Sequence, residues 1–281
     1  MTTDIPSSVQ AWRLPKDEEA WIDHHSIQLR DVSISPPGEG EVLVKLYATS
    51  LNFRIFPANI LIRIPSYLTY EEAATLPGAG LTAWACLFET AFSRPVGPGS
   101  TILAQGSGGV SVFGAQLAKA VGARVIATTS SADKAEKYRK LVGADEVINY
   151  RETPEWSEEV RKLTDGKGVE QILEVGGQTT LPQSLKAAQV GGHIHILGMV
   201  GGFEGTDISF AEFSMAMILG RLNLHGQAVG SKVMFQRLVE FMEKHKIKPV
   251  IGKAFEWDQA VEAFDYVAAG AHFGKVVIKI A

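Results

Sequence analysis

A short glycine turn, Gly106 to Gly109, is the part of this sequence whose residue types and spacing best suit ligand chemistry. It follows an apolar run of strand type, TILAQ at 101–105, and glycine interrupts both strands and helix interiors. After the turn, apolar residues recur at spacings of three and four, which places on one helical face Val110, Phe113, Leu117 and Val121. Gly122 ends this helix in a left-handed cap, and RVIAT at 124–128 is a second strand. The stretch is therefore predicted to form a β-α-β unit that begins at a glycine turn.

Such a unit binds the pyrophosphate of a dinucleotide at the free amide groups of the helix N-terminus. Gly106 and Gly108 occupy the first two positions of the fingerprint G-x-G-x-x-G, while Ser111 occupies the third. A glycine turn in any α/β protein is the alternative reading, but both strands and the helix stand where the motif requires them. We therefore predict dinucleotide binding by Gly106, Ser107, Gly108, Gly109 and Val110.

Strands and helices continue to alternate after this unit, which predicts a doubly wound parallel sheet of the α/β class. Helices are expected at 132–142, 155–166 and 181–192, and strands at 146–150, 171–177 and 193–202. Ligands of such a sheet lie beyond the carboxyl ends of its strands. The glycine turn is therefore expected to share one crevice with Ser130, Gly176 and Gly198. Val175, next to Gly176, is included among the predicted cofactor contacts.

Both ends of the chain have a different, strand-rich pattern. Strands are expected at 8–14, 26–34, 41–50 and 274–280, and helices at 81–91, 232–247 and 257–270. The final strand is expected to rejoin the sheets of the first fifty residues. The predicted organisation is a β-rich domain, 1–90 plus 232–281, into which a nucleotide-binding domain, 91–231, is inserted.

Composition excludes several classes of protein. The chain has 281 residues, 46% of them hydrophobic, which is ample for a packed core. A net charge of −4 gives no general attraction to nucleic acid, and a single cysteine excludes a disulfide framework or a cysteine-rich zinc site. We find no signal peptide and no apolar run of about twenty residues, so no membrane span is expected. A reducing cytoplasmic setting is predicted.

The end of the second strand predicts which nicotinamide cofactor is bound. A site that selects NAD usually carries an acidic residue there, for the ribose 2′-hydroxyl. Here the strand ends in Thr128-Thr129-Ser130-Ser131 without a carboxylate, and Lys134 follows in the next helix. Small hydroxyls and a lysine suit a 2′-phosphate. Most lysines in such a position are merely solvated, so the missing acid is the stronger half of the argument for NADPH at Ser130, Ser131 and Lys134.

Histidine and cysteine form no pattern for a catalytic zinc, which needs three protein ligands. Cys86 belongs to an apolar helix, as a buried unreactive thiol would. His24-His25 are adjacent in a polar stretch and lack partners at ligand spacing. His193 and His195 share one side of a strand but have no cysteine or acid nearby. We therefore predict no metal ion.

Five stretches together resemble the medium-chain dehydrogenase/reductases, and the zinc-independent branch of quinone oxidoreductases, enoyl reductases and alcohol-dehydrogenase-like proteins in particular. They are GLTAW (80–84), the glycine turn, GADEVINY (143–150), LEVGG (173–177) and HFGKVVI (272–278). The resemblance implies a GroES-like barrel domain, a Rossmann domain, NADPH and a homodimer.

The resemblance also implies roles for single residues. Tyr150 would lie beside the adenosine phosphate end of the cofactor. The nicotinamide half would be lined by Thr82, Leu197, Gly198 and the backbone from Phe273 to Lys275. His272, just before this backbone, is expected to have no catalytic role. Asn52 matches the active-site asparagine of the family, although a turn-capping loop residue would look the same.

The chain departs from the family directly after Asn52. Family members continue through a long barrel segment with active-site loops, whereas here Arg54 runs almost directly into PANILIRIP at 57–65. Much of the GroES-like catalytic domain is therefore predicted to be deleted after Arg54. Such a deletion leaves strand edges to be covered and opens the site to water. A splice form or a gene prediction that lacks an exon would give the same sequence.

Two functions follow from these observations. The first is an NADPH-dependent oxidoreductase that transfers hydride to a small molecule, an enone, quinone or aldehyde, without zinc. The second is a nucleotide-binding-fold protein that has lost redox turnover and serves a cyclase-like or binding role. The intact cofactor motifs favour the first, which we predict, and the deletion favours the second.

Overall fold

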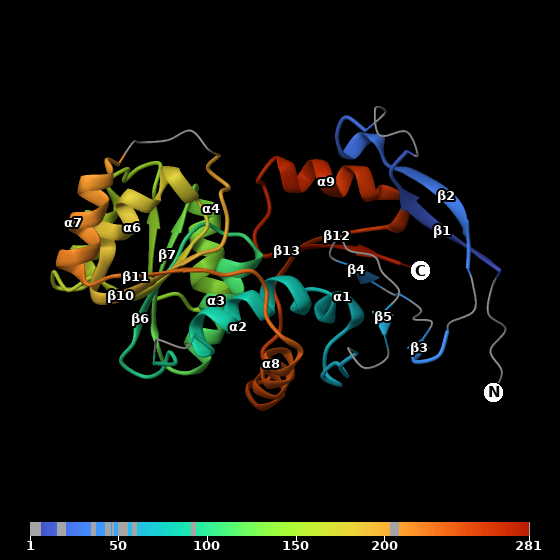
Figure 1. The fold of residues 1–281 in the computed structure, drawn as a ribbon, viewed down its shortest axis with the longest axis horizontal. Coiled ribbons are helices and arrows are strands. Elements are labelled where there is room, and N and C mark those ends of the chain that lie inside the picture. The colour runs from blue at the N-terminus through green and yellow to red at the C-terminus, as the bar shows by residue number, and fades with distance from the viewer. Residues whose placement is uncertain are drawn as a thin grey trace.

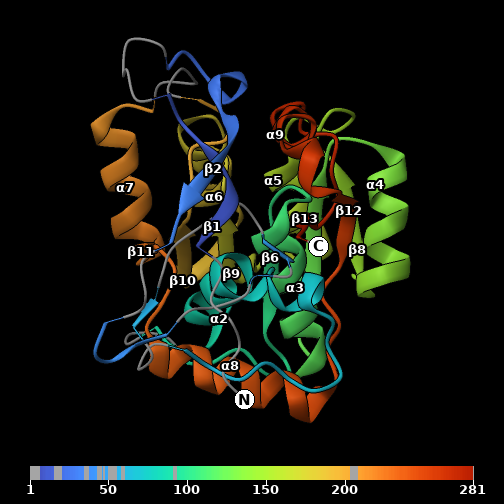
Figure 2. The same ribbon diagram turned by 90° about the vertical axis from the view of Figure 1, so that its right-hand side faces the viewer.

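The computed structural model (Figures 1 and 2) describes residues 7–15, 21–34, 38–42, 46, 48–49, 56–57, 61–90, 94–202 and 208–280. Its centre is a parallel sheet of six strands in the spatial order β11-β10-β9-β6-β7-β8. These strands are β6 (Thr101–Ala104), β7 (Arg124–Thr129), β8 (Glu146–Asn149), β9 (Val169–Glu174), β10 (Ala188–Ile196) and β11 (Asn223–Gly226). The chain runs outward from β6 to β8, returns to β9 on the other side of β6 and runs outward again. This order confirms the predicted doubly wound α/β fold and puts its switch point between β6 and β9.

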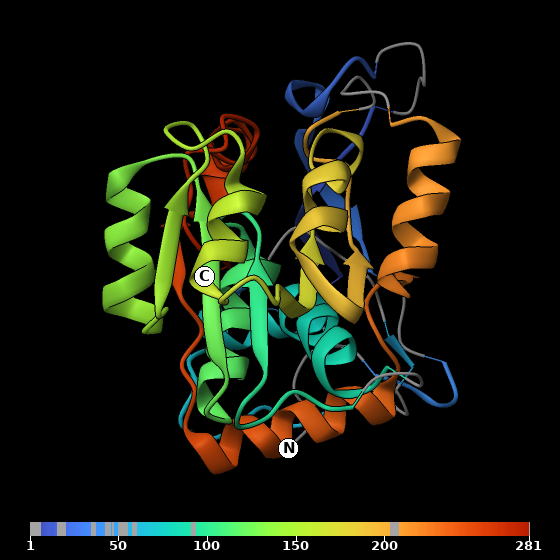
Figure 3. The same cartoon turned by 90° about the vertical axis from the view of Figure 1, so that its left-hand side faces the viewer.

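Helices cover both faces of the sheet (Figure 3), and an apolar layer lies between sheet and helices on each face. Alternate strand residues supply the two layers, as the period of two in a strand requires, so that Ile102 faces one layer and Leu103 the other. The first layer is closed by α2 (Leu81–Phe88), α3 (Gly109–Ala120) and the π-helical turn η5 (Tyr138–Val142), which continues α4 (Ala132–Lys137). The second is closed by α5 (Trp156–Leu163), α6 (Leu181–Ala187) and α7 (Phe210–Gly220).

A further apolar cluster joins the helices on the outer side of α3. It contains Phe113 of α3 and Leu238 and Met242 of α8 (Lys232–His245). Leu76 of η4 (Leu76–Gly80), which follows α1 (Tyr70–Ala73), belongs to the same cluster. The segment before α2 and the start of the tail therefore pack against the nucleotide-binding unit.

The strands from the two ends of the chain form smaller sheets. Strand β13 (Lys275–Lys279) pairs in parallel with β12 (Ile251–Phe255) and antiparallel with β4 (Ala48–Thr49), which confirms that the final strand rejoins the first fifty residues. Helix α9 (Ala260–Ala268) packs on β13, and Trp12 and Ile27 join their apolar cluster. The remaining pairs are β1 (Ser8–Arg13) with β2 (Gln28–Ser33), and β3 (Glu41–Val42) with β5 (Phe56–Pro57).

Several predicted boundaries were wrong. The helix expected at 181–192 ends at Ala187, because buried Ala188 already pairs with Val169 of β9, and a bulge follows before His193. The strand expected to reach 202 ends at Ile196, and the helix expected to reach 91 ends at Phe88. Sequence patterns did not reveal α7 or β11. Helix α7 is apolar except at Glu212 and Ser214, so it shows little helical periodicity, and β11 is a short NLHG strand.

No helix in the described part of the chain has the length and apolar character that a bilayer crossing requires. The division into domains 1–90 plus 232–281 and 91–231 stays a prediction.

Candidate functional site

The carboxyl ends of five neighbouring strands bring most of the predicted cofactor residues into one row. In spatial order from β10 to β8, the row contains Leu197 and Gly198, Val175 and Gly176, Gly106 to Val110, Ser130 and Ser131, and Tyr150. Parallel strands end at the same edge, so the row spans the switch point at which ligands of such sheets bind. We call these residues the carboxyl-end row.

The glycine turn leaves the N-terminus of α3 available to an anion. Gly106 has a φ of +70°, a conformation that suits glycine, and its N–H donates to Thr128 Oγ1 at 3.3 Å. Gly108 caps the helix and offers no side-chain acceptor. The first amide groups of α3 thus keep the capacity to bind a phosphate.

The third glycine of the G-x-G-x-x-G fingerprint is replaced by a serine. Ser111 is buried and its hydroxyl donates to the carbonyl of Gln105 at 2.5 Å. Close packing of the helix on the sheet comes instead from Gly114, where a Cβ would collide with Leu173 of β9. The imperfect G-x-G-x-x-G pattern therefore still permits the close approach of helix and strand that the motif serves.

The C-terminal segment contacts the glycine turn directly. The N–H of Gly274 donates to the carbonyl of Ser107 at 2.9 Å, and Gly108 and Gly274 form a parallel bridge. The Lys275 side chain lies so close to Gly109 that a Cβ there would collide with it, and burial lowers the pKa of this lysine. Phe273 is buried edge-on against Tyr138, with ring centroids 4.9 Å apart. The C-terminal segment around Gly274 is therefore hydrogen-bonded to the glycine turn and packed against it.

A buried carboxylate, which sequence reasoning missed, holds the loop after β9. Glu174 has no exposed surface, and its Oε1 accepts hydrogen bonds from the N–H groups of Gly176 and Gly177 at 2.9 and 3.0 Å. Its other donors are the amide of Gln105, at 2.7 Å, and the hydroxyls of Thr180 and Ser184. Five donors thus fix the loop that carries Val175 and Gly176. The acidic residue within LEVGG is the signal that could have indicated this role.

Basic side chains gather towards the β7 and β8 end of the row, and we call Lys134, Arg151, Lys275 and the neighbouring His272 the cationic cluster. Burial, Arg151 and Lys137 lower the pKa of Lys134. Burial, Lys134 and Lys275 likewise lower the pKa of His272, whose Nδ1 is buried without a hydrogen-bond partner among the described residues. In the described residues, no carboxylate forms an ion pair with any member of the cluster, although Asp133, which pairs with Lys137, acts to raise the pKa of Lys134. The positive field that Arg151, Lys134 and Lys275 produce at their neighbours favours a bound anion.

Sequence reasoning found only part of this cluster. Lys134 was predicted at the phosphate, and its Nζ donates to the carbonyl of Gly270 at 2.7 Å. Arg151 was missed, although its place directly after Tyr150 at the end of β8 could have indicated it. His272 belongs to the cluster through space rather than through any local pattern.

The other predicted residues fall in three groups. Ser131 caps α4 and accepts the N–H of Lys134 at 3.3 Å, while Tyr150 is 39% exposed at the strand end. Thr82 is buried on α2, and its hydroxyl donates to the carbonyl of Gly78 at 2.7 Å. Asn52 and the predicted deletion after Arg54 lie outside the described residues.

Two statements about the histidines were wrong. His24 and His25 do have partners at ligand distance, Asp23 beside them and Asp265 on α9. Glu170 acts to raise the pKa of His193, although burial and His225 lower that pKa overall. His193 Nδ1 lies 3.0 Å from His225 Nε2. Asp23 directly precedes the two histidines and could have been found in the sequence, whereas Asp265 and Glu170 come close only through helix packing and strand pairing.

Comparison with known proteins gives consistent results. The sequence pattern of a family described as zinc-binding dehydrogenase matches residues 109–244. A zinc-type alcohol dehydrogenase-like protein of Schizosaccharomyces pombe is 42% identical over 228 residues, which are 81% of this chain and 65% of that protein. A 2-haloacrylate reductase of a Burkholderia species is 36% identical over 237 residues, 80% of this chain and 68% of that protein. This chain thus spans about two thirds of the length of these curated relatives.

The fold also matches solved structures. The crystal structure of an NAD-dependent alcohol dehydrogenase superposes with a TM-score of 0.85 at 25% sequence identity. The superposition covers 97% of this chain and all of that one. The similarity therefore extends beyond the nucleotide-binding sheet to the strands from both chain ends.

Proposed function

Because this chain belongs to the medium-chain dehydrogenase/reductase family of oxidoreductases, we propose that it is an NADPH-dependent reductase that transfers hydride to an enone, a quinone or an aldehyde without zinc. A relative named 2-haloacrylate reductase supports an activated alkene within this substrate class. The small-molecule substrate would lie at the carboxyl-end row, with Asn52 as the residue that polarises it.

One observation carries the choice of NADPH. The end of β7 has no carboxylate to accept the ribose 2′-hydroxyl of NAD, while Lys134, Arg151 and His272 stand together beside it. Basic side chains that form no ion pair with a carboxylate among the described residues suit a phosphate of charge near −2. A solved structure of the same fold is named as NAD-dependent, so the choice rests on the residues of this chain and not on its neighbours.

The residues of the site fit a dinucleotide, and each has a definite task. The bound nicotinamide would supply the hydride. The amides at the start of α3 would bind the pyrophosphate, and Gly106 lets the backbone approach it closely. Glu174 orients the loop of Val175 and Gly176 through its five donors, and the Gly274 contact holds the tail against the turn. These contacts position the cofactor, which is the main catalytic contribution of a protein to hydride transfer.

Zinc does not fit the row. A catalytic zinc needs three protein ligands from histidine, cysteine or a carboxylate. Among the described residues, one group of three such side chains has its ligand atoms together, and it lies in Asp23, His24 and His25 rather than in the row.

Transfer of a deuterium label tests the proposed reaction. The protein would be incubated with NADPH deuterated at nicotinamide C4 and, separately, with an enone, a quinone and an aldehyde. We expect NADPH oxidation with at least one substrate, and deuterium on its carbon when the enone or aldehyde reacts. Tight NADPH binding without oxidation by any of the three would contradict a redox role and favour the cyclase-like or binding alternative.

We also propose a homodimer that forms through α7 and β11. Strand β11 ends the six-stranded sheet, and α7 beside it has no buried residue. Phe210, Ile218 and Leu219 are 84%, 67% and 70% exposed, which is an apolar face of the kind that a partner covers. A second copy supplies the same edge and face, so an isologous pair would extend the sheet.

Light scattering after gel filtration tests the dimer. The wild type should have twice the mass of one chain. The variant Ile218→Asp should be a monomer, because a charge would be desolvated at the interface. Leu141→Asp, at a 54% exposed site on η5, serves as the matched control and should stay dimeric. A monomeric wild type would contradict the proposal.

The predicted domain division is kept as a proposal. Separate apolar clusters support it, since the cluster of α9, β12 and β13 is distinct from the two layers of the six-stranded sheet. The boundary at residue 90 is tested by limited proteolysis, which should release a fragment that begins close to it.

A further inference from the structure

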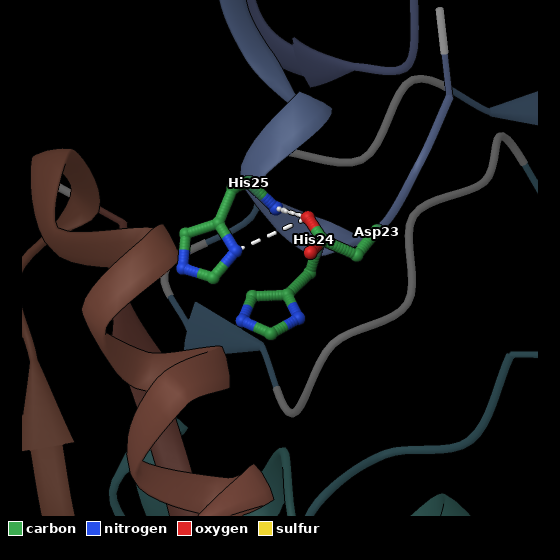
Figure 4. A group of neighbouring side chains, drawn as sticks. All are labelled: Asp23, His24 and His25. Atoms are coloured by element: carbon green, nitrogen blue, oxygen red, sulfur yellow. Dashed lines mark hydrogen bonds and ion pairs between the residues drawn. The ribbon is translucent and has the colours of Figure 1, made fainter. Parts of the chain in front are cut away.

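Two neighbouring histidines near the N-terminus point at one aspartate near the C-terminus. His24 Nε2 and His25 Nε2 each lie 2.9 Å from Asp265 Oδ1 of α9. The other side of His25 meets Asp23, whose Oδ1 is 3.1 Å from Nδ1 and 2.8 Å from the backbone N–H (Figure 4). One ligand atom each from Asp23, His24 and His25 lies within 4.8 Å of the others. We call Asp23, His24, His25 and Asp265 the His-Asp cluster.

Folded elements hold the cluster on both sides. Asp23 caps the 3₁₀ turn η2 (His24–Ser26) in a capping box with Ser26. The His24 ring stacks on Phe264 of α9, with centroids 5.5 Å apart. Nearby, the Trp12 indole N–H donates to the Trp257 carbonyl at 2.9 Å and further joins the N-terminal hairpin to the tail. The four side chains are therefore brought together by two packed elements and not by one flexible loop.

The His25 ring lies between two carboxylates. Its Nε2 faces Asp265 Oδ1, and its Nδ1 faces Asp23 Oδ1. A cation bound to one of these nitrogens leaves an N–H on the other, which can donate to the carboxylate on that side. The ring can therefore serve as a metal ligand and keep one of its two carboxylate partners.

We propose that Asp23, His24 and His25 bind a first-row divalent cation such as Zn²⁺, with Asp265 on the outer nitrogen of His25. Imidazole nitrogens and carboxylate oxygens form a donor set that zinc prefers, at about 2.0–2.2 Å. Neighbouring donors of a tetrahedral site then lie about 3.3 Å apart. The observed 3.1 Å between Asp23 Oδ1 and His25 Nδ1 needs to open by only a few tenths of an ångström. Asp265, on Nε2 of the same ring, would fix the tautomer of His25, as carboxylates do in other metal sites.

The site is separate from the nucleotide site, and it has a structural consequence. Asp265 would join the ion site to α9, and α9 leads directly into Gly270 and His272 beside the glycine turn. Binding to the folded state alone would raise the melting temperature of the protein. This inference depends on the His-Asp cluster and does not require the proposed reductase activity.

Metal titration of the full chain tests the proposal. Metal-free wild type at pH 7.5 should bind one equivalent of Zn²⁺ by calorimetry, and one of Co²⁺ with the visible absorption of a four-coordinate site. Asp265→Asn keeps the shape but removes the charge of the carboxylate on the outer nitrogen of His25, and it should weaken binding of both ions by at least about tenfold, as should His25→Ala. His245→Ala, which removes an exposed histidine of α8, is the matched control and should bind as the wild type does.

Three results would overturn the proposal. They are no Zn²⁺ or Co²⁺ uptake by the wild type, wild-type affinity in Asp265→Asn, and loss of uptake in His225→Ala with uptake retained in Asp265→Asn. X-ray absorption at the zinc edge of the wild type keeps the test independent of how the variants fold. It should show nitrogen and oxygen ligands with imidazole scattering, and a sulfur ligand would contradict the assignment.

Discussion

The two ends of the carboxyl-end row differ in whether their charged side chains have partners of opposite charge or hydrogen-bond donors. On the β9 side, Glu174 is fully buried and five donors converge on its two oxygens. On the β7 and β8 side, Arg151 lowers the pKa of Lys134, and Lys134 and Lys275 lower that of His272, while in the described residues no carboxylate forms an ion pair with any of these four side chains. A saturated charge is structural, because it has no capacity left for a ligand. An unsaturated cluster is where a ligand gains most, since a bound anion is attracted to its positive charges.

The largest expected effect comes from removing the charge of Glu174, on the β9 side of the row. Glu174→Gln places an amide where five donors need acceptors, so it should lower the free energy of unfolding by about 3 kcal/mol. Urea denaturation measures this. Glu155→Gln is the matched control, because Glu155 accepts one amide bond at the surface. That control should change stability by less than about 0.5 kcal/mol. Equal effects of the two substitutions would show that the buried network does not hold the loop.

The next largest effect is expected at Gly274, where the C-terminal segment contacts the glycine turn. Gly274 has a φ of +76°, and a Cβ there would collide with the carbonyl oxygen of Val250. Gly274→Ala should therefore lower the free energy of unfolding by about 2–3 kcal/mol. Gly270→Ala tests the backbone conformation alone, because Gly270 has a φ of +62° and open space around its Cα. Its cost should be about 1 kcal/mol. A Gly274→Ala cost no larger than that would contradict the close contact.

A buried histidine, His195, makes the free energy of unfolding depend on pH. Burial, with His225 and His193, lowers the pKa of His195 to about 3, while an unfolded histidine has its ordinary value near 6.5. His195 is therefore neutral in the folded protein, and acid favours the unfolded state. This contribution is complete above pH 6.5 and is lost as the pH falls from there towards 3. From pH 7.5 to 5 it should amount to about 2 kcal/mol.

Urea titrations at the two pH values measure this loss as a difference between variants. His195→Gln retains a polar partner for Gln171, which lies 3.0 Å from His195 Nε2, and it should lose about 2 kcal/mol less stability than the wild type on acidification. The exposed His245→Gln should follow the wild type. An unchanged pH dependence in His195→Gln would show that His195 titrates equally in both states.

The sequence revealed those features that depend on local order. Glycines at the element ends and the alternation of strands with helices predicted the doubly wound sheet. The absence of an acidic residue after β7 predicted a preference for NADPH. The packing role of Gly114 was missed because it depends on which strand lies against α3, whereas the positions of Arg151 and Glu174 at strand ends were signals that the sequence already contained. The pairing of His24 with Asp265, 241 positions later in the chain, could not be predicted at all, since only the packing of α9 brings them together.

The central claim is that the cationic cluster selects NADPH, and a fluorescence titration with NADPH and NADH tests it most directly. The wild type should bind NADPH at least about tenfold more tightly than NADH, because the charge-assisted contacts to the 2′-phosphate are worth about 1.5–3 kcal/mol each. Lys134→Ala and Arg151→Ala should each weaken NADPH binding by about tenfold or more and leave NADH binding nearly unchanged. Lys137→Ala, which removes a lysine already paired with Asp133 on the same helix, should alter neither. Equal affinity of the wild type for both cofactors, or equal losses for both in the Lys134 and Arg151 variants, would contradict the account.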